Sequence, residues 1–348
     1  MHMADALISP AVGGAMWAAA AGLTIYSAKK VREEKDDRKV PLMGVMGAFV
    51  FAAQMINFTI PGTGSSGHLG GGLILAVLLG PHAAFLTMAS ILTVQALFFA
   101  DGGLLALGCN IINLGLFPCF IAYPLIYKPL AGRSPGGRRI LAASIPAAVA
   151  GLLMGAFAVV METVFSGITE LPFFTFVLLM LPIHLAIGIV EGLVTAGVLT
   201  FVWKARPEIM GISENAASSR SWSAGKVMAG ILAVAVVTGG LLSWFASANP
   251  DGLEWSMAKT SGHEELASPE RGAHATMAAL QEKTAFLPDY GFKPSGGQEE
   301  HGAASESSGG ESESWPSVSA GTTVSGLVGA AMTLMLAGLV GLGIRKFS

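Results

Sequence analysis

Long apolar runs separated by short polar segments dominate the chain. A helix needs about 20 apolar residues to cross the hydrocarbon core of a bilayer. Runs of about this length lie at 8–28, 40–59, 83–100, 103–127, 139–164, 172–203, 225–247 and 323–345. A ninth run, at 71–80, is too short to cross alone, and Gly80-Pro81 separates it from the next one. We therefore predict an all-α polytopic membrane protein in which residues 69–80 form a short or broken helix packed among the others.

The basic residues are concentrated in the short segments between these runs. If the N-terminus is outside and the chain crosses nine times, the cytoplasmic segments are 29–40, 80–82, 128–139, 204–226 and the C-terminal tail. Together they hold 16 of the 20 Lys and Arg residues. Short loops rich in Lys and Arg stay in the cytoplasm. The charges thus predict a multi-pass protein of a bacterial-type inner membrane, with its N-terminus outside and its C-terminus in the cytoplasm.

The spacing of the runs divides the chain into two modules and a linker. Residues 1–205 form a seven-helix unit, 206–224 a polar cytoplasmic linker, and 225–348 a two-helix hairpin. The loop of the hairpin, 248–322, faces outward and has 12 acidic residues against four basic ones. Its stretch SGGQEEHGAASESSGGESESW (295–315) has too little apolar surface to fold alone, so we expect disorder there. His263, His274 and His301 in this loop are expected to belong to a solvated linker.

Composition narrows the class further. The chain has 348 residues, 52% of them hydrophobic and 12% charged, which fits neither an average soluble domain nor a disordered chain. A net charge of -3 gives no argument for a nucleic-acid partner. Cys109 and Cys119 lie inside an apolar run and are expected to be two small buried hydrophobes. No Lys or Arg precedes Lys29, so we expect no signal peptide.

The first two residues carry candidate metal chemistry. A free amine on Met1, the backbone amide nitrogen of His2 and the Nδ1 atom of its imidazole can lie in one plane and close two chelate rings. Cu(II) and Ni(II) favour square-planar nitrogen sites. A fourth donor is available in the glycine-rich stretch PGTGSSGHLGGG, where His68 lies at the outer end of the second run. The alternative is that each histidine is incidental, since a lone histidine in such a loop is more often solvated or capping.

These residues resemble a known family. The start MH..D and the blocks FVFAAQMINFTIPGTGSSGHLGGGLILAVLLGP and VQALFFADGGLLALGCNIINLG resemble the substrate-binding membrane component of nickel and cobalt energy-coupling-factor transporters, the CbiM/NikM family. The likeness covers about 1–205. The hairpin, with ANPDGLEWS after its first helix and PDYGF further on, resembles the small CbiN/NikN companion subunit, here fused. The sequence departs from the family at Met3, Ala4 and Ala6.

The resemblance implies that Met1, His2 and His68 hold a transported nickel or cobalt ion. The planar nitrogen donors favour Ni²⁺ in the first place and Co²⁺ next. It implies a capture subunit that works with a transmembrane coupling subunit and ATP-binding subunits. The sequence contains neither a phosphate-binding loop GxxxxGK[ST] nor a GxSxG elbow, and HEELA at 263 fails as HExxH. We therefore expect no enzyme. A stand-alone cation permease and a membrane metal sensor remain as alternatives.

Other polar residues fall near this site. Asp5 either accepts a hydrogen bond from a ligand or caps the first helix. Gln54 and Asn57 either orient His68 or the N-terminal segment, or bond between helices. Asp101 and Asn110 mark an outward turn and are expected to be structural.

Two ionisable residues lie deeper. His184 and Glu191 are seven apart, on one face of a helix, where intramembrane ionisable groups are costly. We expect a structural hydrogen-bonded pair, with an ion or proton relay as the alternative. Ala15 and Ala19 form a small-xxx-small pattern that suits either the coupling subunit or internal packing.

Overall fold

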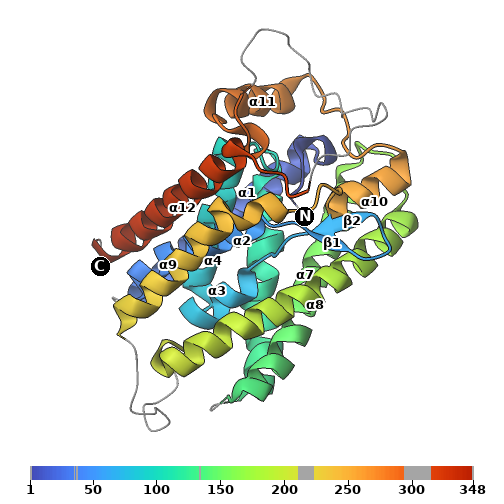
Figure 1. The fold of residues 1–348 in the computed structure, drawn as a ribbon. Helices are drawn as coiled ribbons and strands as arrows, with labels where there is room; N and C mark the ends of the chain where they lie inside the picture. Colours follow the sequence, from blue (N-terminus) through green and yellow to red (C-terminus); the bar gives the residue numbers. More distant parts are fainter. Residues whose placement is uncertain are drawn as a thin grey trace.

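The computed structural model describes residues 2–34, 36, 38–132, 135–210, 223–293 and 315–346. Long helices lie side by side in one bundle (Figure 1). The helices of the first 210 residues are α1 (Pro10–Glu34), α2 (Lys39–Gln54), α3 (Gly72–Leu79), α4 (Pro81–Phe98), α5 (Leu107–Ile111), η2 (Ile112–Tyr127), α6 (Lys128–Ala131), α7 (Gly137–Ser166) and α8 (Phe173–Ala205), with the short turns η1 (Asp5–Leu7) and η3 (Pro207–Met210). The rest are α9 (Ala224–Gly240), η5 (Leu242–Phe245), α10 (Gly252–Ser261), α11 (Gly272–Thr284), η6 (Pro288–Tyr290) and α12 (Ala320–Lys346).

The bundle confirms the all-α polytopic class. Six helical stretches are long and apolar enough to cross a membrane, and α2 and α9 are shorter apolar helices. The stretches are Pro10–Glu34, Pro81–Phe98, Leu107–Ala131, Gly137–Ser166, Phe173–Ala205 and Ala320–Lys346. The protein is therefore a multi-pass membrane protein. Cys109 and Cys119 are buried and not disulfide-bonded, as expected.

The predicted short helix is present as α3. All eight of its residues are buried, so its backbone ends lie among other helices and not in lipid. Gly71 before it and Gly80 after it have φ of +76° and +80°, a left-handed conformation that favours glycine. Pro81 then begins α4, because proline at the first helical position loses no hydrogen bond.

The second apolar run ends as a helix earlier than its hydrophobicity predicts. Helix α2 stops at Gln54, and the apolar residues that follow form strand β1 (Phe58–Ile60). This strand pairs antiparallel with β2 (Ser65–Gly67), with Phe58 opposite Gly67. The hairpin leads directly into His68, so the local switch from helix to strand sets the start of the glycine-rich loop.

The expectation of a solvated linker after α9 is wrong for residues 252–261 and 272–284. This part of the loop forms α10 and α11, which lie with β1, β2 and the N-terminus at one end of the bundle, away from the C-terminus (Figure 1). His274 is buried, and its Nε2–H donates to the Ile8 carbonyl at 2.9 Å. The expectation failed because it rested on the acidic charge of the loop and overlooked the small apolar faces by which these two helices pack. The predicted disorder at 295–315 falls, apart from Trp315, outside the described residues.

The hairpin helices pack closely on the bundle through glycine. Helix α12 lies along α2 and also contacts α4 and α9. A Cβ added to Gly326 would lie 2.2 Å from the backbone oxygen of Gly239 on α9, and one added to Gly329 would lie 2.0 Å from Cζ of Phe51 on α2. Small residues permit such backbone approach between membrane helices.

This packing predicts the effect of a single methyl group. Gly326→Ala should lower the stability of the protein by about 1–3 kcal/mol, the usual cost of overpacking, because α9 and α12 must separate. Gly338→Ala, on the same helix with nothing within 4 Å of the added Cβ, is the matched control and should leave stability unchanged or slightly raised. Thermal unfolding in detergent measures both. Equal melting temperatures for the two variants would refute the close crossing.

Candidate metal-binding site

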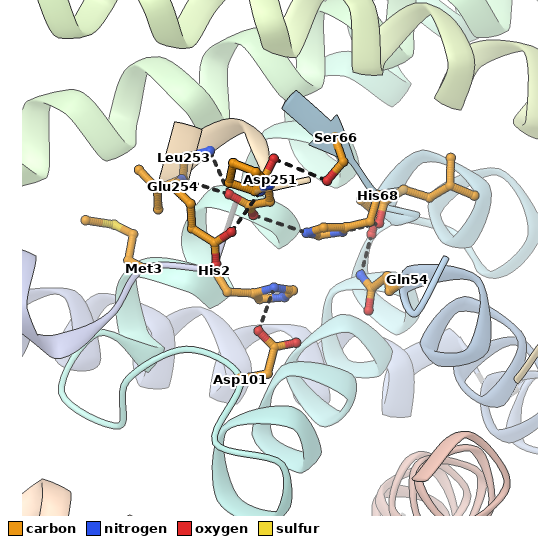
Figure 2. A network of polar contacts seen from close by, with 12 residues as sticks. His2, Met3, Gln54, Ser66, His68, Asp101, Asp251, Leu253 and Glu254 are labelled. Carbon is orange, nitrogen blue, oxygen red and sulfur yellow. Dashed lines mark hydrogen bonds and ion pairs between the residues drawn. The ribbon is translucent and has the colours of Figure 1, made fainter. Parts of the chain in front are cut away.

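Two histidines far apart in sequence meet at the N-terminal end of the bundle. The rings of His2 and His68 stack with centroids 5.0 Å apart and planes inclined by 6° (Figure 2). Both side chains are nearly buried, 8% and 9% exposed. Met1, whose amine is the third predicted donor group, lies outside the described residues. The structure thus brings together the two predicted imidazoles.

Hydrogen bonds fix the backbone of Met3, the residue after His2, through both its N–H group and its carbonyl. The Met3 N–H donates to Oδ1 of Asn110 at 2.8 Å, and Nδ2 of Asn110 donates back to the Met3 carbonyl at 3.2 Å. The Gly103 N–H donates to the same carbonyl at 2.9 Å. The Asn110 side chain therefore bonds to both backbone groups of Met3, as the backbone of a neighbouring strand would. Sequence analysis assigned it a structural role, and the structure shows which segment it fixes.

Glycines make this close approach possible. A Cβ on Gly103 would lie 1.8 Å from Oδ1 of Asp5, and one on Gly102 would lie 2.9 Å from Nδ2 of Asn110. Gly102 also has φ of +79°. The sequence DGG at 101–103 is therefore the surface on which the N-terminal segment rests. A side chain at either glycine would push this segment away.

Asp101 contacts the candidate ligand His2 directly. Its Oδ1 lies 3.1 Å from Nδ1 of His2, and the hydroxyl of Tyr290 donates to its Oδ2. Burial raises the pKa of Asp101, but His2 and Tyr290 outweigh burial and hold this pKa below its usual range. The carboxylate is therefore charged and orients the imidazole. Tyr290 belongs to the sequence PDYGF of the fused hairpin, so the hairpin takes part in this arrangement.

The contact with Asp101 changes one detail of the predicted chelate. The prediction used Nδ1 of His2 as a donor to the metal, whereas in the structure Nδ1 faces Asp101. The Nε2 atom of His2 is buried and makes no hydrogen bond within the described part of the chain. A metal held through Nδ1 requires the ring to turn away from Asp101, whereas a metal held through Nε2 does not.

A buried carboxylate and an amide hold the glycine-rich loop that carries His68. Glu191 on α8 accepts hydrogen bonds from the N–H groups of Gly70 at 2.7 Å and Gly71 at 3.2 Å, one on each oxygen. Gln54 donates to the Gly70 carbonyl at 2.9 Å. Without these partners the loop would bury unpaired backbone groups among apolar helices, which is costly. Glu191 and Gln54 thus fix the loop next to His68.

The expected pairing of His184 with Glu191 is wrong. Glu191 bonds to the loop, and Nδ1 of His184 bonds to the Met180 carbonyl at 2.8 Å. Their spacing places both on one face of α8, as predicted, but residues seven apart lie about 10 Å apart along a helix. Each side chain therefore finds its own partner in the structure.

His68 is prepared to act as a neutral ligand. Its Nδ1–H donates to the Leu69 carbonyl at 3.1 Å, which places the lone pair on Nε2. Burial lowers the pKa of His68 to about 3, so the ring is neutral at physiological pH. Its Nε2 lies 3.8 Å from Oδ2 of Asp251. Neutral imidazole is the form that binds metals.

Asp251 is the residue that sequence reasoning missed. It begins α10 in the fused hairpin, where its Oδ1 accepts the N–H groups of Leu253 and Glu254 and Glu254 accepts the Asp251 N–H, a capping box (Figure 2). The Ser66 N–H donates to the Pro250 carbonyl at 2.8 Å, and the Ser66 hydroxyl to Asn249 at 2.7 Å. The D-x-x-E spacing was readable as a helix start. The position of Asp251 beside His68 could not be predicted, because it depends on contacts between residues 183 positions apart, such as Ser66 and Asn249.

The remaining predicted residues take other roles. Asp5 accepts the Ala106 N–H at 2.9 Å, so it caps the turn before α5. Among the described residues it bonds neither to His2 or His68 nor to the start of the first long helix. The Asn57 carbonyl accepts the Ser247 N–H at 2.7 Å and joins the loop to the hairpin. Within the described residues no group of three or more His, Cys, Asp and Glu side chains is arranged to hold a metal. A metal between His2 and His68 therefore needs donors of another kind, such as an amine or a backbone amide.

Comparison with known proteins shows the family to which the chain belongs. The sequence model of the CbiM family, described as the cobalt uptake substrate-specific transmembrane region, matches residues 2–209, and that of the PDGLE domain matches 225–346. A putative metal transport protein of Haloquadratum walsbyi is 36% identical over 60% of this chain and 93% of its own length. A putative fused nickel transport protein NikMN of Archaeoglobus fulgidus is 31% identical over 83% of this chain and 88% of its own length.

A solved structure shares the fold of the first module. A crystal structure of a transition metal transporter is 31% identical, with a TM-score of 0.52, and the match covers 59% of this chain and 93% of that one. The family match spans more than half of the chain and contains both stacked histidines, while the PDGLE match contains Asp251 and Tyr290. The chain therefore belongs to the CbiM family of metal transport proteins, with a CbiN-like PDGLE domain fused after it.

Proposed function

We propose that this protein captures a divalent transition-metal ion outside the membrane, as the substrate-specific subunit of an ATP-driven importer of the energy-coupling-factor type. The observation that carries the proposal is the meeting of His2 and His68, two buried imidazoles supplied by separate segments and each flanked by a carboxylate. Because an imidazole binds a metal in the plane of its ring, one of the two parallel rings must turn for both to bind one ion. Family membership supports transport of a metal. The coupling to ATP rests on the resemblance and on the lack of a phosphate-binding loop in the sequence.

The proposed ligands are Met1, through its amine, His2 and His68. Four nitrogens in or near one plane favour nickel over cobalt, because square-planar nitrogen sites suit Ni²⁺. The family description names cobalt, and the Archaeoglobus relative is named for nickel. We propose Ni²⁺ as the main substrate and Co²⁺ as the next. Asp101 and Asp251 add negative charge near the site, which attracts a cation and orients the imidazoles.

Energy is proposed to come from separate subunits. Helix α1 is the span with the smallest buried share, and Ala15 and Ala19 are exposed on it. Small exposed residues allow a partner helix to approach closely, so we propose this face for the transmembrane coupling subunit. The proposed orientation has the metal site outside and the C-terminus inside. If the chain instead worked as a stand-alone permease, uptake would survive deletion of the ATP-binding subunits.

Removing one donor at a time tests the metal site. His2→Ala and His68→Ala should each lower nickel affinity by at least about 100-fold, because loss of a ligand costs at least as much as loss of a partner that merely orients one. A Gly-Ser extension ahead of Met1, longer than two residues so that no new N-terminal chelate forms, should do the same. Calorimetric titration of the purified protein measures affinity. His263→Ala, at an exposed position, is the control.

The outcome decides between the proposed site and its alternatives. Tight binding that survives both the extension and His2→Ala would show that the sequence Met1-His2 is incidental. Binding lost in His263→Ala would place the ion in the outer loop instead.

Glu191 should act on the metal only through the loop. Glu191→Gln keeps the size of the side chain but replaces one acceptor oxygen with an NH₂ group, so only one of the Gly70 and Gly71 N–H groups can be satisfied. We expect nickel affinity to fall by about 10- to 100-fold, as for other groups that orient ligands. Glu170→Gln, at an exposed position between α7 and α8, should leave affinity unchanged. Equal affinities for the two variants would contradict a positioning role for Glu191.

A further inference from the structure

A small cavity lies next to the stacked histidines and shares only His68 with the proposed capture ligands. The cavity has room for about one water molecule. Three polar side chains line it, His68, His184 and Asp251, and the other lining residues are Gly67, Gly70, Leu114, Leu152, Ile187 and Gly252. A cavity of this size can hold one water or one dehydrated metal ion.

His184 presents a lone pair inside the protein. The side chain is 1% exposed, and its Nδ1–H donates to the Met180 carbonyl at 2.8 Å, which leaves the lone pair on Nε2. Within the described part of the chain this Nε2 is buried and has no hydrogen-bond partner. Buried polar atoms are seldom left without a partner, so this nitrogen has the capacity to bind a water molecule or an ion.

The fused hairpin closes the cavity from the outer side. Gly252 lies so near α8 that a Cβ added to it would be 2.7 Å from Cγ2 of Ile183 and 3.1 Å from Cε1 of His184. This approach places the neighbouring Asp251 in the same cavity wall as His184. The two imidazoles and the carboxylate therefore come from three different elements, the glycine-rich loop, α8 and the start of α10.

We propose that Nε2 of His184 and the carboxylate of Asp251 form an inner binding site for a divalent transition-metal ion, which shares His68 with the capture site. This inference rests on the proposed function. Imidazole nitrogen and carboxylate oxygen bind such ions at about 2.0–2.2 Å. Two donors on opposite sides of one ion are then about 4 Å apart, and the 3.8 Å between Nε2 of His68 and Oδ2 of Asp251 agrees with this. No three such side chains are grouped for a metal among the described residues, so the inner site requires these side chains to move together when the ion binds.

A second cavity with two polar side chains adjoins the inner site. It is similar in size, shares Gly70, Leu114 and Leu152 with the first and reaches Asn113 and Glu191. The Oδ1 atom of Asn113 is also buried without a hydrogen-bond partner among the described residues. An ion that leaves the capture site toward the membrane interior therefore meets the inner site first and polar atoms beyond it.

The test uses the full chain with the capture site disabled and the cobalt ion alone as the probe. In His2→Ala, calorimetric titration with Co²⁺ should show one residual ion bound more weakly than in the unaltered chain. Adding His184→Gln should weaken this residual binding by at least tenfold. Adding Asp251→Asn should do the same, and it keeps α10 capped because Asn is as good a cap as Asp. Adding His82→Gln, which alters a half-buried histidine at the start of α4, is the control and should change nothing.

Each outcome has a distinct meaning. Loss of the residual ion in both double variants, with melting temperatures like that of His2→Ala, supports the inner site. If His184→Gln does not fold, Asp251→Asn decides alone. No residual binding in His2→Ala, or residual binding indifferent to both substitutions, overturns the inner site, and the cavity then holds water only. Failure of the unaltered chain to bind nickel tightly would instead overturn the proposed function, whatever the residual binding shows.

Discussion

The hydrogen bonds from Gly70 and Gly71 to Glu191 are the interaction on which the candidate site depends. A glycine-rich loop that enters an apolar bundle carries N–H and C=O groups that lipid and aliphatic side chains cannot satisfy. Glu191 takes two of these donors and Gln54 supplies one donor in return. The loop can therefore run inside the bundle instead of over its surface. This depth places His68 where His2 can stack on it.

The N-terminal segment is also fixed by hydrogen bonds from a buried side chain to its backbone. Asn110 bonds the Met3 backbone in both directions, and Gly102 and Gly103 allow that backbone to lie directly against the loop. The two histidines thus reach one place by different routes, one on a loop held from within and one on a chain end held from the side. The carboxylate of Asp101 then sets the orientation of the His2 ring.

The fused hairpin is part of this arrangement. Asp251 lies beside His68, Tyr290 bonds to Asp101, and His274 bonds to the Ile8 carbonyl. In relatives that resemble the first module alone, such contacts would have to come from a second chain. Fusion makes them intramolecular, which raises the effective concentration of the hairpin at the site.

The sequence predicted the class, most helices and the two histidines for definite physical reasons. Apolar runs of bilayer length leave few alternatives to helices, and Gly80-Pro81 marked the short helix α3 correctly. An unusual second residue and a glycine-rich loop are local features, so His2 and His68 could be recognised without coordinates. The early end of α2 was not predictable from hydropathy, because a short segment such as Phe58–Ile60, with two apolar residues of three, fits a strand as well as a helix.

Contacts between distant segments escaped prediction. Asp251 was read as part of a companion module, and nothing local indicates that α10 folds back onto the loop after β2. His184 and Glu191 were paired because they share a helix face, but each bonds to a different backbone group. His274 was assigned to a solvated linker although it is buried. For Asp251, Glu191 and His274 the deciding partner lies on another element, whereas His184 bonds to Met180 on its own helix.

X-ray absorption spectroscopy of the nickel-loaded protein tests the central claim most directly. A metal held by the Met1 amine, the His2 amide and imidazole, and His68 predicts a four-coordinate planar edge, a first sphere of nitrogen only, and outer scattering from two imidazoles. An octahedral edge with mainly oxygen neighbours, or scattering from fewer than two imidazoles, would contradict the account.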